Sequence, residues 1–229
     1  MSPMDDIVFF IDCDNTLLDN DRVIADLRAH LEREFGVECS DRYWAIFEQL
    51  RSELGYADYL GALQRYRLED DFDTTLLRMS SWLVDYPFSD RLYPGALDVL
   101  RHLRTRGLTV ILSDGDVVFQ PRKIQRSGLW DAAEGRVLIA IHKETKLDAV
   151  AARFPARHYI MIDDKLRVLS MMKAHWGDRL TTVFPRQGHY ACDAAIVAAY
   201  PSADFTVERI GDLIAFDPPA ARSAVKEVT

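Results

Sequence analysis

Short apolar runs, rich in β-branched and aromatic residues, recur along the chain and are separated by longer stretches of mixed polarity. Such runs are typical of strands that are buried on both faces, as in parallel sheets. The pattern predicts six strands, over 7–11, 108–112, 136–141, 158–162, 180–184 and 203–207. Apolar residues at helical spacing lie beside or between the later runs, over 95–107, 145–154, 165–177 and 189–200. This alternation predicts βαβ units, so we expect an α/β fold with a mostly parallel sheet flanked by helices.

One long stretch, residues 18–92, interrupts the alternation and carries almost no strand pattern. Helical spacing recurs within it, over 22–36, 43–55 and 73–85. The segment 86–95 is rich in proline and is typical of an irregular return to the sheet. We therefore expect a discontinuous sheet domain, a smaller all-helical domain and a frayed C-terminal tail. Their respective bounds are 1–17 with 93–216, 18–92, and 217–229.

Polar residues gather directly after four of the predicted strands. In an open α/β sheet, ligands bind outside the carboxyl ends of the strands. Taken singly, some of these residues have a purely structural explanation, since Asp14 suits a turn and Asp164 suits a helix N-cap. In chain order, the set is Asp12, Asp14, Ser113, Asp114, Gly115, Lys143, Lys146, Asp163 and Asp164.

The carboxylates of this set are hard to explain as a group without a cation. Acidic pairs at two strand ends would bring several negative charges into one cleft, where each raises the pKa of its neighbours. A divalent ion that prefers oxygen ligands, such as Mg²⁺, relieves this repulsion. The sequence thus predicts a Mg²⁺ site at one edge of the sheet.

The same groups resemble, in order, the four motifs of a known enzyme superfamily. The run DCDNT (12–16) resembles the DxDxT motif of the haloacid dehalogenase-like hydrolases, and VILS (110–113) resembles their second motif. Lys143 resembles the third motif, and MIDD (161–164) resembles the acidic fourth. The resemblance spans residues 7–210. It implies a Rossmann-like core, with a helical cap inserted between the first and second motifs.

The resemblance implies a role for each of the residues that would meet the substrate. Asp12 would be the nucleophile that forms an aspartyl-phosphate, and Asp14 would be the general acid and then the base. Ser113, followed by Asp114 and Gly115, would bind the transferring phosphoryl group. The third-motif lysine would neutralise the charge of that group and of the nucleophile.

Two assignments within the resemblance have alternatives. The third-motif lysine is Lys143 or Lys146, and Lys143 departs less from the family's spacing to the fourth motif. Alignment on the family's single-acid form makes Asp164 the direct metal ligand and Asp163 its outer partner, with the reverse order still open. The Mg²⁺ ligands that the resemblance implies are Asp12, the backbone carbonyl of Asp14, Asp163 and Asp164.

The acid at position 14 bears on the reaction. Dehalogenases of the superfamily lack an acid there, so Asp14 followed by Thr16 favours phosphate chemistry. We expect a Mg²⁺-dependent phosphatase that acts on a small phosphorylated metabolite. A phosphomutase or phosphotransferase would use the same groups and is an alternative, as is a non-catalytic module that binds a phosphorylated ligand. A phospho-receiver domain is disfavoured, because the long insertion separates the first acids from Ser113.

The composition of the chain argues against nucleic acid and membranes as binding partners. The 229-residue chain has a formal net charge of −8, with 48% hydrophobic and 28% charged residues. Nucleic-acid binding requires a basic face, and a membrane span requires roughly 20 apolar residues, and the sequence predicts neither. Three widely spaced cysteines and an acidic N-terminal segment predict a cytoplasmic protein. We expect a monomer or homodimer with a small-molecule substrate.

Overall fold

The computed structural model describes residues 5–67 and 74–215. The expected tail, 217–229, lies outside these residues, as does the first position of the helix expected at 73–85.

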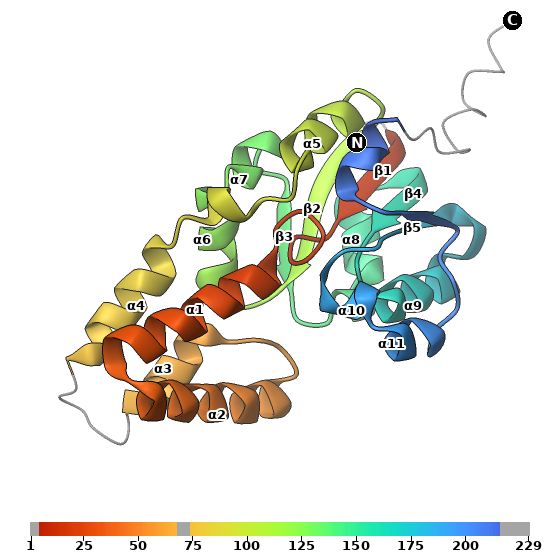
Figure 1. The fold of residues 1–229 in the computed structure, drawn as a ribbon. Coiled ribbons are helices and arrows are strands. Elements are labelled where there is room, and N and C mark those ends of the chain that lie inside the picture. The colour runs from red at the N-terminus through yellow and green to blue at the C-terminus, as the bar shows by residue number, and fades with distance from the viewer. Residues whose placement is uncertain (1–4, 68–73, 216–229) are drawn as a thin grey trace, which may run out of the picture.

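A six-stranded sheet, in which every pair of neighbouring strands is parallel, forms the centre of the molecule (Figure 1). Its strands are β1 (Asp5–Ile11), β2 (Leu108–Asp114), β3 (Val137–Ala140), β4 (Ala156–Ile162), β5 (Leu180–Pro185) and β6 (Phe205–Val207). All six predicted strands are present, and the predicted α/β class is confirmed. The order is β3-β2-β1-β4-β5-β6, so the topology reverses between β1 and β4. Sheets of this kind bind ligands at such a reversal.

Helices surround the sheet and fill the long insertion. They are α1 (Asn20–Phe35), α2 (Val37–Leu54), α3 (Tyr59–Arg67), α4 (Thr75–Asp85), α5 (Ala96–Arg104), α6 (Phe119–Arg126), α7 (Leu129–Ala132), α8 (Leu147–Arg153), α9 (Leu166–Trp176), α10 (Gly188–Cys192) and α11 (Ala194–Ala198). Short 3₁₀ turns lie at Phe88–Arg91, Lys143–Thr145, Gly177–Arg179 and Ile210–Ile214. Within the described ranges, no helix combines the length and apolarity that a membrane span requires.

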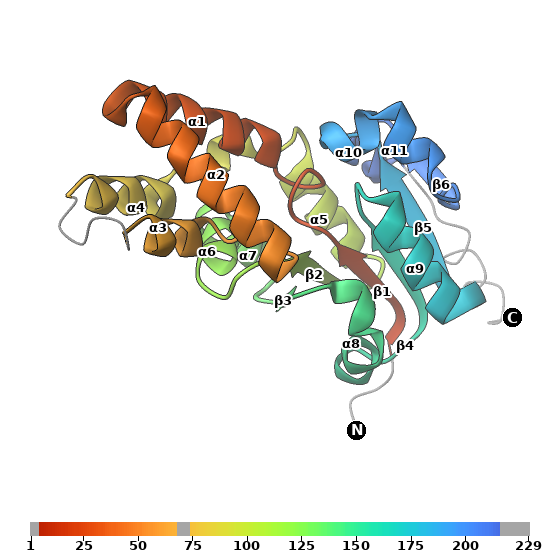
Figure 2. The same cartoon turned by 90° about the horizontal axis from the view of Figure 1, so that it is seen from below.

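Both faces of the sheet are buried, which explains the unbroken apolar sequences of the strands. In β1, Phe9 and Ile11 pack in a core with residues of α5 and α6. Val8 and Phe10 point to the opposite face and pack with residues of α8 and α9. Figure 2 shows α5, α6 and α7 on one side of the sheet, with α8 and α9 on the other.

Helices α1–α4 gather at one end of the molecule, beside α6 (Figures 1 and 2). Their apolar core is continuous with one core of the sheet. Phe119 of α6 joins the two, because its ring centroid lies 5.1 Å from that of Tyr59 and 5.7 Å from that of Phe88. The insertion is therefore packed against the sheet through aromatic contacts.

Several helices differ from the sequence expectations for local reasons. The expected helix 189–200 is two helices, because Asp193 adopts an extended conformation and its carboxylate accepts hydrogen bonds from the N–H groups of Ala195 and Ile196. This is an N-cap, which starts α11 anew. Helix α3 lies in the stretch predicted to be helical but had no predicted bounds of its own, and α6 and α7 were not predicted. Helix α6 begins after Asp116, whose carboxylate accepts from the N–H groups at 118 and 119.

Candidate active site

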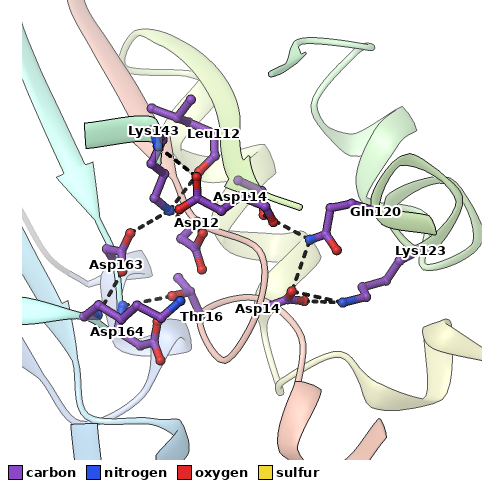
Figure 3. A network of polar contacts seen from close by, with 12 residues as sticks. Asp12, Asp14, Thr16, Leu112, Asp114, Gln120, Lys123, Lys143, Asp163 and Asp164 are labelled. Atoms are coloured by element: carbon purple, nitrogen blue, oxygen red, sulfur yellow. Dashed lines mark hydrogen bonds and ion pairs between the residues drawn. The ribbon is translucent and has the colours of Figure 1, made fainter. Parts of the chain in front are cut away.

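Four strands deliver polar side chains to one edge of the sheet (Figure 3). Asp12 directly follows β1, Ser113 lies at the end of β2, and Lys143 lies in the turn after β3. Asp163 and Asp164 directly follow β4. All five side chains are buried. Residues that are distant in sequence therefore meet where the topology predicts a ligand site.

Lys143 is the centre of the charged part of this cluster. Its ammonium binds Asp12 Oδ1, lies 2.7 Å from Asp163 Oδ2, and donates to the carbonyl of Leu112 at 3.1 Å. Burial alone would lower the pKa of Lys143, but the carboxylates of Asp12 and Asp163 outweigh burial and hold that pKa above its usual value. These contacts favour the charged form of the buried Lys143. The other candidate, Lys146, is exposed.

Asp12 has one oxygen that Lys143 binds and one that has no hydrogen-bond partner among the residues that the structure describes. The partnerless Oδ2 is buried, as is the whole residue, which is 3% exposed. Burial raises the pKa of Asp12 to about 7, against the opposing effect of Lys143. The negative charge of Asp163 also raises the pKa of Asp12. Ionisation of Asp12 is therefore energetically unfavourable in this structure relative to water.

The acidic pair after β4 divides its contacts unequally. Asp163 Oδ1 accepts the N–H of Lys165 at 2.8 Å, and its Oδ2 faces Lys143. Both carboxylate oxygens of Asp164 are buried, and neither has a hydrogen-bond partner within residues 5–67 and 74–215. Burial raises the pKa of Asp164 well above its usual value, although Lys165 opposes this. Asp164 is therefore the member of the pair with both carboxylate oxygens available to bind a cation.

These carboxylates fit a hard cation. One oxygen from each of Asp12, Asp163 and Asp164 can be chosen so that all lie within 4.8 Å of one another. Three buried carboxylates this close, each with at least one oxygen that has no hydrogen-bond partner among the described residues, match the oxygen-rich ligand sets of Mg²⁺. The side chain of Asp14 is turned elsewhere, so any ligand from that residue would be its backbone carbonyl, as the resemblance implies.

Thr16 holds the first acidic segment against the second. Its hydroxyl accepts the backbone N–H of Asp164 at 3.1 Å, and the threonine is completely buried. Asn15, which lies between Asp14 and Thr16 in the chain, has a positive φ of 59°, a conformation that asparagine tolerates better than most residues. The chain therefore turns sharply after Asp14 and does not continue as a strand.

Asp14 does not share the lysine of Asp12 but is bound by Lys123 and Gln120 of α6. Nζ of Lys123 lies 2.7 Å and 3.0 Å from the two carboxylate oxygens of Asp14. Nε2 of Gln120 lies 3.2 Å from Asp14 Oδ2 and 3.0 Å from Ser113 Oγ. Gln120, which Figure 3 shows beside Asp14, thus connects the second acid to the hydroxyl of Ser113.

Sequence reasoning missed Gln120 and Lys123. They are three residues apart on α6, a spacing that puts both on one face of a helix. The helix itself was not predicted, because its eight residues include only two large apolar side chains, Phe119 and Ile124, which are not at helical spacing. A polar pair at this spacing, in the first helix after the second motif, is the signal that would have identified them.

Asp114 and Gly115 serve the local structure in this conformation. Asp114 Oδ1 accepts the N–H of Lys143 at 2.8 Å, which fixes the turn that presents the lysine. The N–H of Gly115 donates to the carbonyl of Ala140 at 3.1 Å. A Cβ at Gly115 would lie 2.9 Å from Cβ and Cγ of Gln120. Glycine is therefore required where this loop passes α6.

A cavity of about 700 Å³ lies over this edge of the sheet and is also lined by the helical insertion. Asp14, Asp114 and Gly115 line it from the sheet side. Across it, the guanidinium of Arg51 on α2 donates to the hydroxyl of Tyr190 on α10 at 2.8 Å. Aromatic and basic side chains also line it, among them Trp44, Phe47, Tyr59, Phe119 and Lys165.

Comparison with known families gives one match, to the haloacid dehalogenase-like hydrolases, over residues 8–175. No curated protein matches the chain. Among solved structures, a haloacid dehalogenase-like hydrolase of Burkholderia xenovorans LB400 is 71% identical. The alignment covers 94% of this chain and 97% of that one, with a TM-score of 0.88.

More distant structures share the fold. The HAD-hydrolase YfnB of Bacillus subtilis, solved with magnesium bound, is 16% identical over 91% of this chain and 96% of that one, with a TM-score of 0.60. An L-2-haloacid dehalogenase of Xanthobacter autotrophicus, solved with chloropropionic acid covalently bound, is 17% identical over the same shares of the two chains, with a TM-score of 0.58. At this level of identity the likeness concerns the fold alone.

Proposed function

The chain belongs to the haloacid dehalogenase-like hydrolases, and we propose that it is a Mg²⁺-dependent phosphatase that acts on a small phosphate monoester. Asp12 is the proposed nucleophile and Asp14 the proposed general acid and base. The proposal extends to the helical insertion, residues 18–92, as a cap over the sheet domain.

The observation that carries this proposal is the second acid. Asp14 lines the cavity, and its side chain is 25% exposed, whereas Asp12 is buried behind it. Displacement of a halide from carbon produces an anion that needs no proton. Cleavage of a phosphate monoester produces an alkoxide that does need one, and a carboxyl group at the cavity wall supplies it. The pairing of a buried acid with a cavity-facing acid therefore suits phosphate esters.

In the first half of the proposed reaction, an oxygen of Asp12 attacks phosphorus. The bond from phosphorus to the leaving oxygen breaks, and the carboxyl group of Asp14 gives its proton to that oxygen. Ser113 holds the phosphoryl group through its hydroxyl. Lys143, already bound to Asp12, offsets the negative charge that gathers on the equatorial oxygens.

In the second half, water attacks the phosphorus of the aspartyl-phosphate. Asp14, now a carboxylate, accepts a proton from this water, and the bond between phosphorus and Asp12 breaks. Inorganic phosphate leaves, and both aspartates return to their initial states. The reaction consumes one water and needs no other reactant.

Mg²⁺ fits the carboxylates described above, with Asp12 and Asp164 as proposed ligands and Asp163 as the partner that Lys143 already holds. When bound, it would supply positive charge that offsets the repulsion among carboxylates and phosphoryl oxygens. The partnerless oxygens of Asp164 support its choice over Asp163 as the direct ligand.

Access to Asp12 requires movement of the insertion. The proposed nucleophile is 3% exposed, which supports a movement of the insertion before a substrate reaches it. Separation of α2 from α10 would break the hydrogen bond between Arg51 and Tyr190 and open the cavity to solvent. Closure over a bound substrate would exclude water other than the attacking molecule.

One pair of assays tests the proposal against the chemistry of the dehalogenase neighbours. The purified protein is given p-nitrophenyl phosphate with Mg²⁺ and, separately, 2-chloropropionate. We expect release of p-nitrophenol and phosphate in equal amounts, loss of this activity in EDTA, and no chloride release. Chloride release without phosphatase activity would overturn the proposal. Nitrophenol without free phosphate, when an acceptor alcohol is present, would favour the phosphotransferase alternative.

A further inference from the structure

Lys123 is a second buried lysine, outside the family motifs that the chain resembles. It lies on α6 and its side chain is 0% exposed. Its Nζ lies 5.5 Å from the ring centroid of Phe119, one turn earlier on the same helix. Burial of an ammonium costs free energy unless its N–H groups donate hydrogen bonds. The acceptors that Lys123 contacts therefore indicate its role.

The three donors of this ammonium match three acceptors. Two are the carboxylate oxygens of Asp14, at 2.7 Å and 3.0 Å. The third is Oδ1 of Asn20, at 2.9 Å. Asn20 is the first residue of α1, where the helical insertion begins. Lys123 therefore ties the cavity-facing acid both to the sheet domain and to the start of the insertion.

Asp14 is held from two positions on α6. Lys123 binds both of its oxygens, and Gln120 binds Oδ2. Three contacts to one carboxylate leave it a single orientation, although a quarter of the side chain is exposed to the cavity. By contrast, Asp12 is bound by Lys143, which lies in the turn after β3. The two acids are oriented independently.

We propose that Lys123 is a positioning residue for Asp14, which fixes the carboxyl group where it can pass a proton to the leaving oxygen. This inference rests on the proposed phosphatase function. It assigns Lys123 no contact with the substrate. The loss of rate on replacing Lys123 should therefore depend on how much the leaving group of the substrate needs a proton.

Two substrates separate this role from a merely structural one. p-Nitrophenolate is a stable leaving group that departs without a proton, whereas an alkoxide requires one. We expect Lys123→Met to lower kcat for an alkyl phosphate by about 10²-fold and for p-nitrophenyl phosphate by less than about threefold. Arg122→Met, one residue earlier on the same helix, is the matched control, because Arg122 contacts Val84 and Asp85 in the insertion.

A double-mutant cycle tests whether Lys123 acts through Asp14. In an Asp14→Asn background, Lys123→Met should have no further effect on the alkyl phosphate, because the group that it positions is already lost. If Lys123→Met fails to fold, Lys123→Arg keeps the charge but displaces it, and should show the same preference for the p-nitrophenyl ester.

An equal loss on both substrates, or full additivity with Asp14→Asn, would overturn the inference and leave the phosphatase proposal intact. Wild-type protein that hydrolyses neither ester would remove the phosphatase proposal, and the inference with it. The two failures are therefore distinguishable.

Discussion

Nζ of Lys143 lies 2.7 Å from Oδ2 of Asp163 while also binding Asp12, so one buried ammonium joins the carboxylates that follow β1 and β4. The contact to Asp163 is an ion pair without an aligned hydrogen bond, whereas the contact to Asp12 is a hydrogen bond. This difference suits a lysine whose principal partner is the nucleophile.

The first prediction concerns the two candidate lysines. Lys143→Met should lower kcat/KM for p-nitrophenyl phosphate by about 10²–10³-fold, because a preorganised cation at the reacting group is removed. Lys146→Met should change it by less than about twofold, since that side chain is exposed. Circular dichroism checks that both variants are folded. A larger loss in Lys146→Met would reverse the assignment.

The second prediction concerns metal binding without reference to activity. Addition of Mg²⁺ to EDTA-treated protein should raise the Tm, with a stabilisation of about 2.7 kcal/mol at 100 times the Kd. Asp164→Asn should lose most of this gain, because it removes the carboxylate with two partnerless oxygens. Asp178→Asn, at an exposed position outside the cluster, is the control. An unchanged gain in Asp164→Asn would contradict the ligand assignment.

The third prediction follows from the pKa of Asp12, which is raised to about 7. An unfolded aspartate has a pKa near 3.9, so between these values the folded state binds more protons than the unfolded state. The contribution of this group to stability therefore falls as pH rises from about 4 to about 7, and is constant above. Asp12→Asn cannot ionise and escapes this loss.

Thermal unfolding in EDTA measures the effect. Relative to wild type, Asp12→Asn should gain roughly 1–3 kcal/mol between pH 4 and pH 7, less than the full shift implies because this window does not span the whole titration of Asp12 in both states. Asp178→Asn should show a flat difference over the same range. A difference for Asp12→Asn that stays flat or declines with pH would be incompatible with a buried, destabilised carboxylate.

The fourth prediction concerns Gly115, whose φ of 155° and close approach to Gln120 both exclude a side chain. Gly115→Ala should displace Gln120 from Ser113 and Asp14 and lower kcat by about tenfold, in addition to a backbone strain of about 1–3 kcal/mol. Gly128→Ala is the matched control, because Gly128 has a positive φ but open space around its Cα. It should lower Tm without lowering kcat in the folded protein. Equal effects on kcat would show that strain alone is responsible.

The sequence predicted the sheet well because its strands are buried on both faces and therefore read as unbroken apolar runs. The strand-end residues followed from the same pattern, since Asp12, Ser113 and Asp163 each lie at a strand terminus. Helix α6 was missed because it is short and mostly polar, so that it has no apolar periodicity. With α6 unseen, Lys123 had no place in the site.

The division of the two acids between two lysines was also beyond the sequence. The spacing of Asp12 and Asp14 suggested two side chains aimed into one cleft. In the structure, the sharp turn at Asn15 directs Asp14 toward α6, and its partner Lys123 is 109 positions away in the chain. Contacts at such separations depend on the packing of α6 against the sheet, which no local pattern encodes.

The central claim is that Asp12 forms a covalent phosphoenzyme. Asp14→Asn removes the base for the second half of the reaction, but p-nitrophenyl phosphate still reacts in the first half because its leaving group needs no proton. Acid quenching of this variant during turnover with Mg²⁺, followed by peptide mass spectrometry, should therefore find a phosphoryl group on Asp12. A phosphoryl group on another residue, or none while nitrophenol is released, would contradict the account.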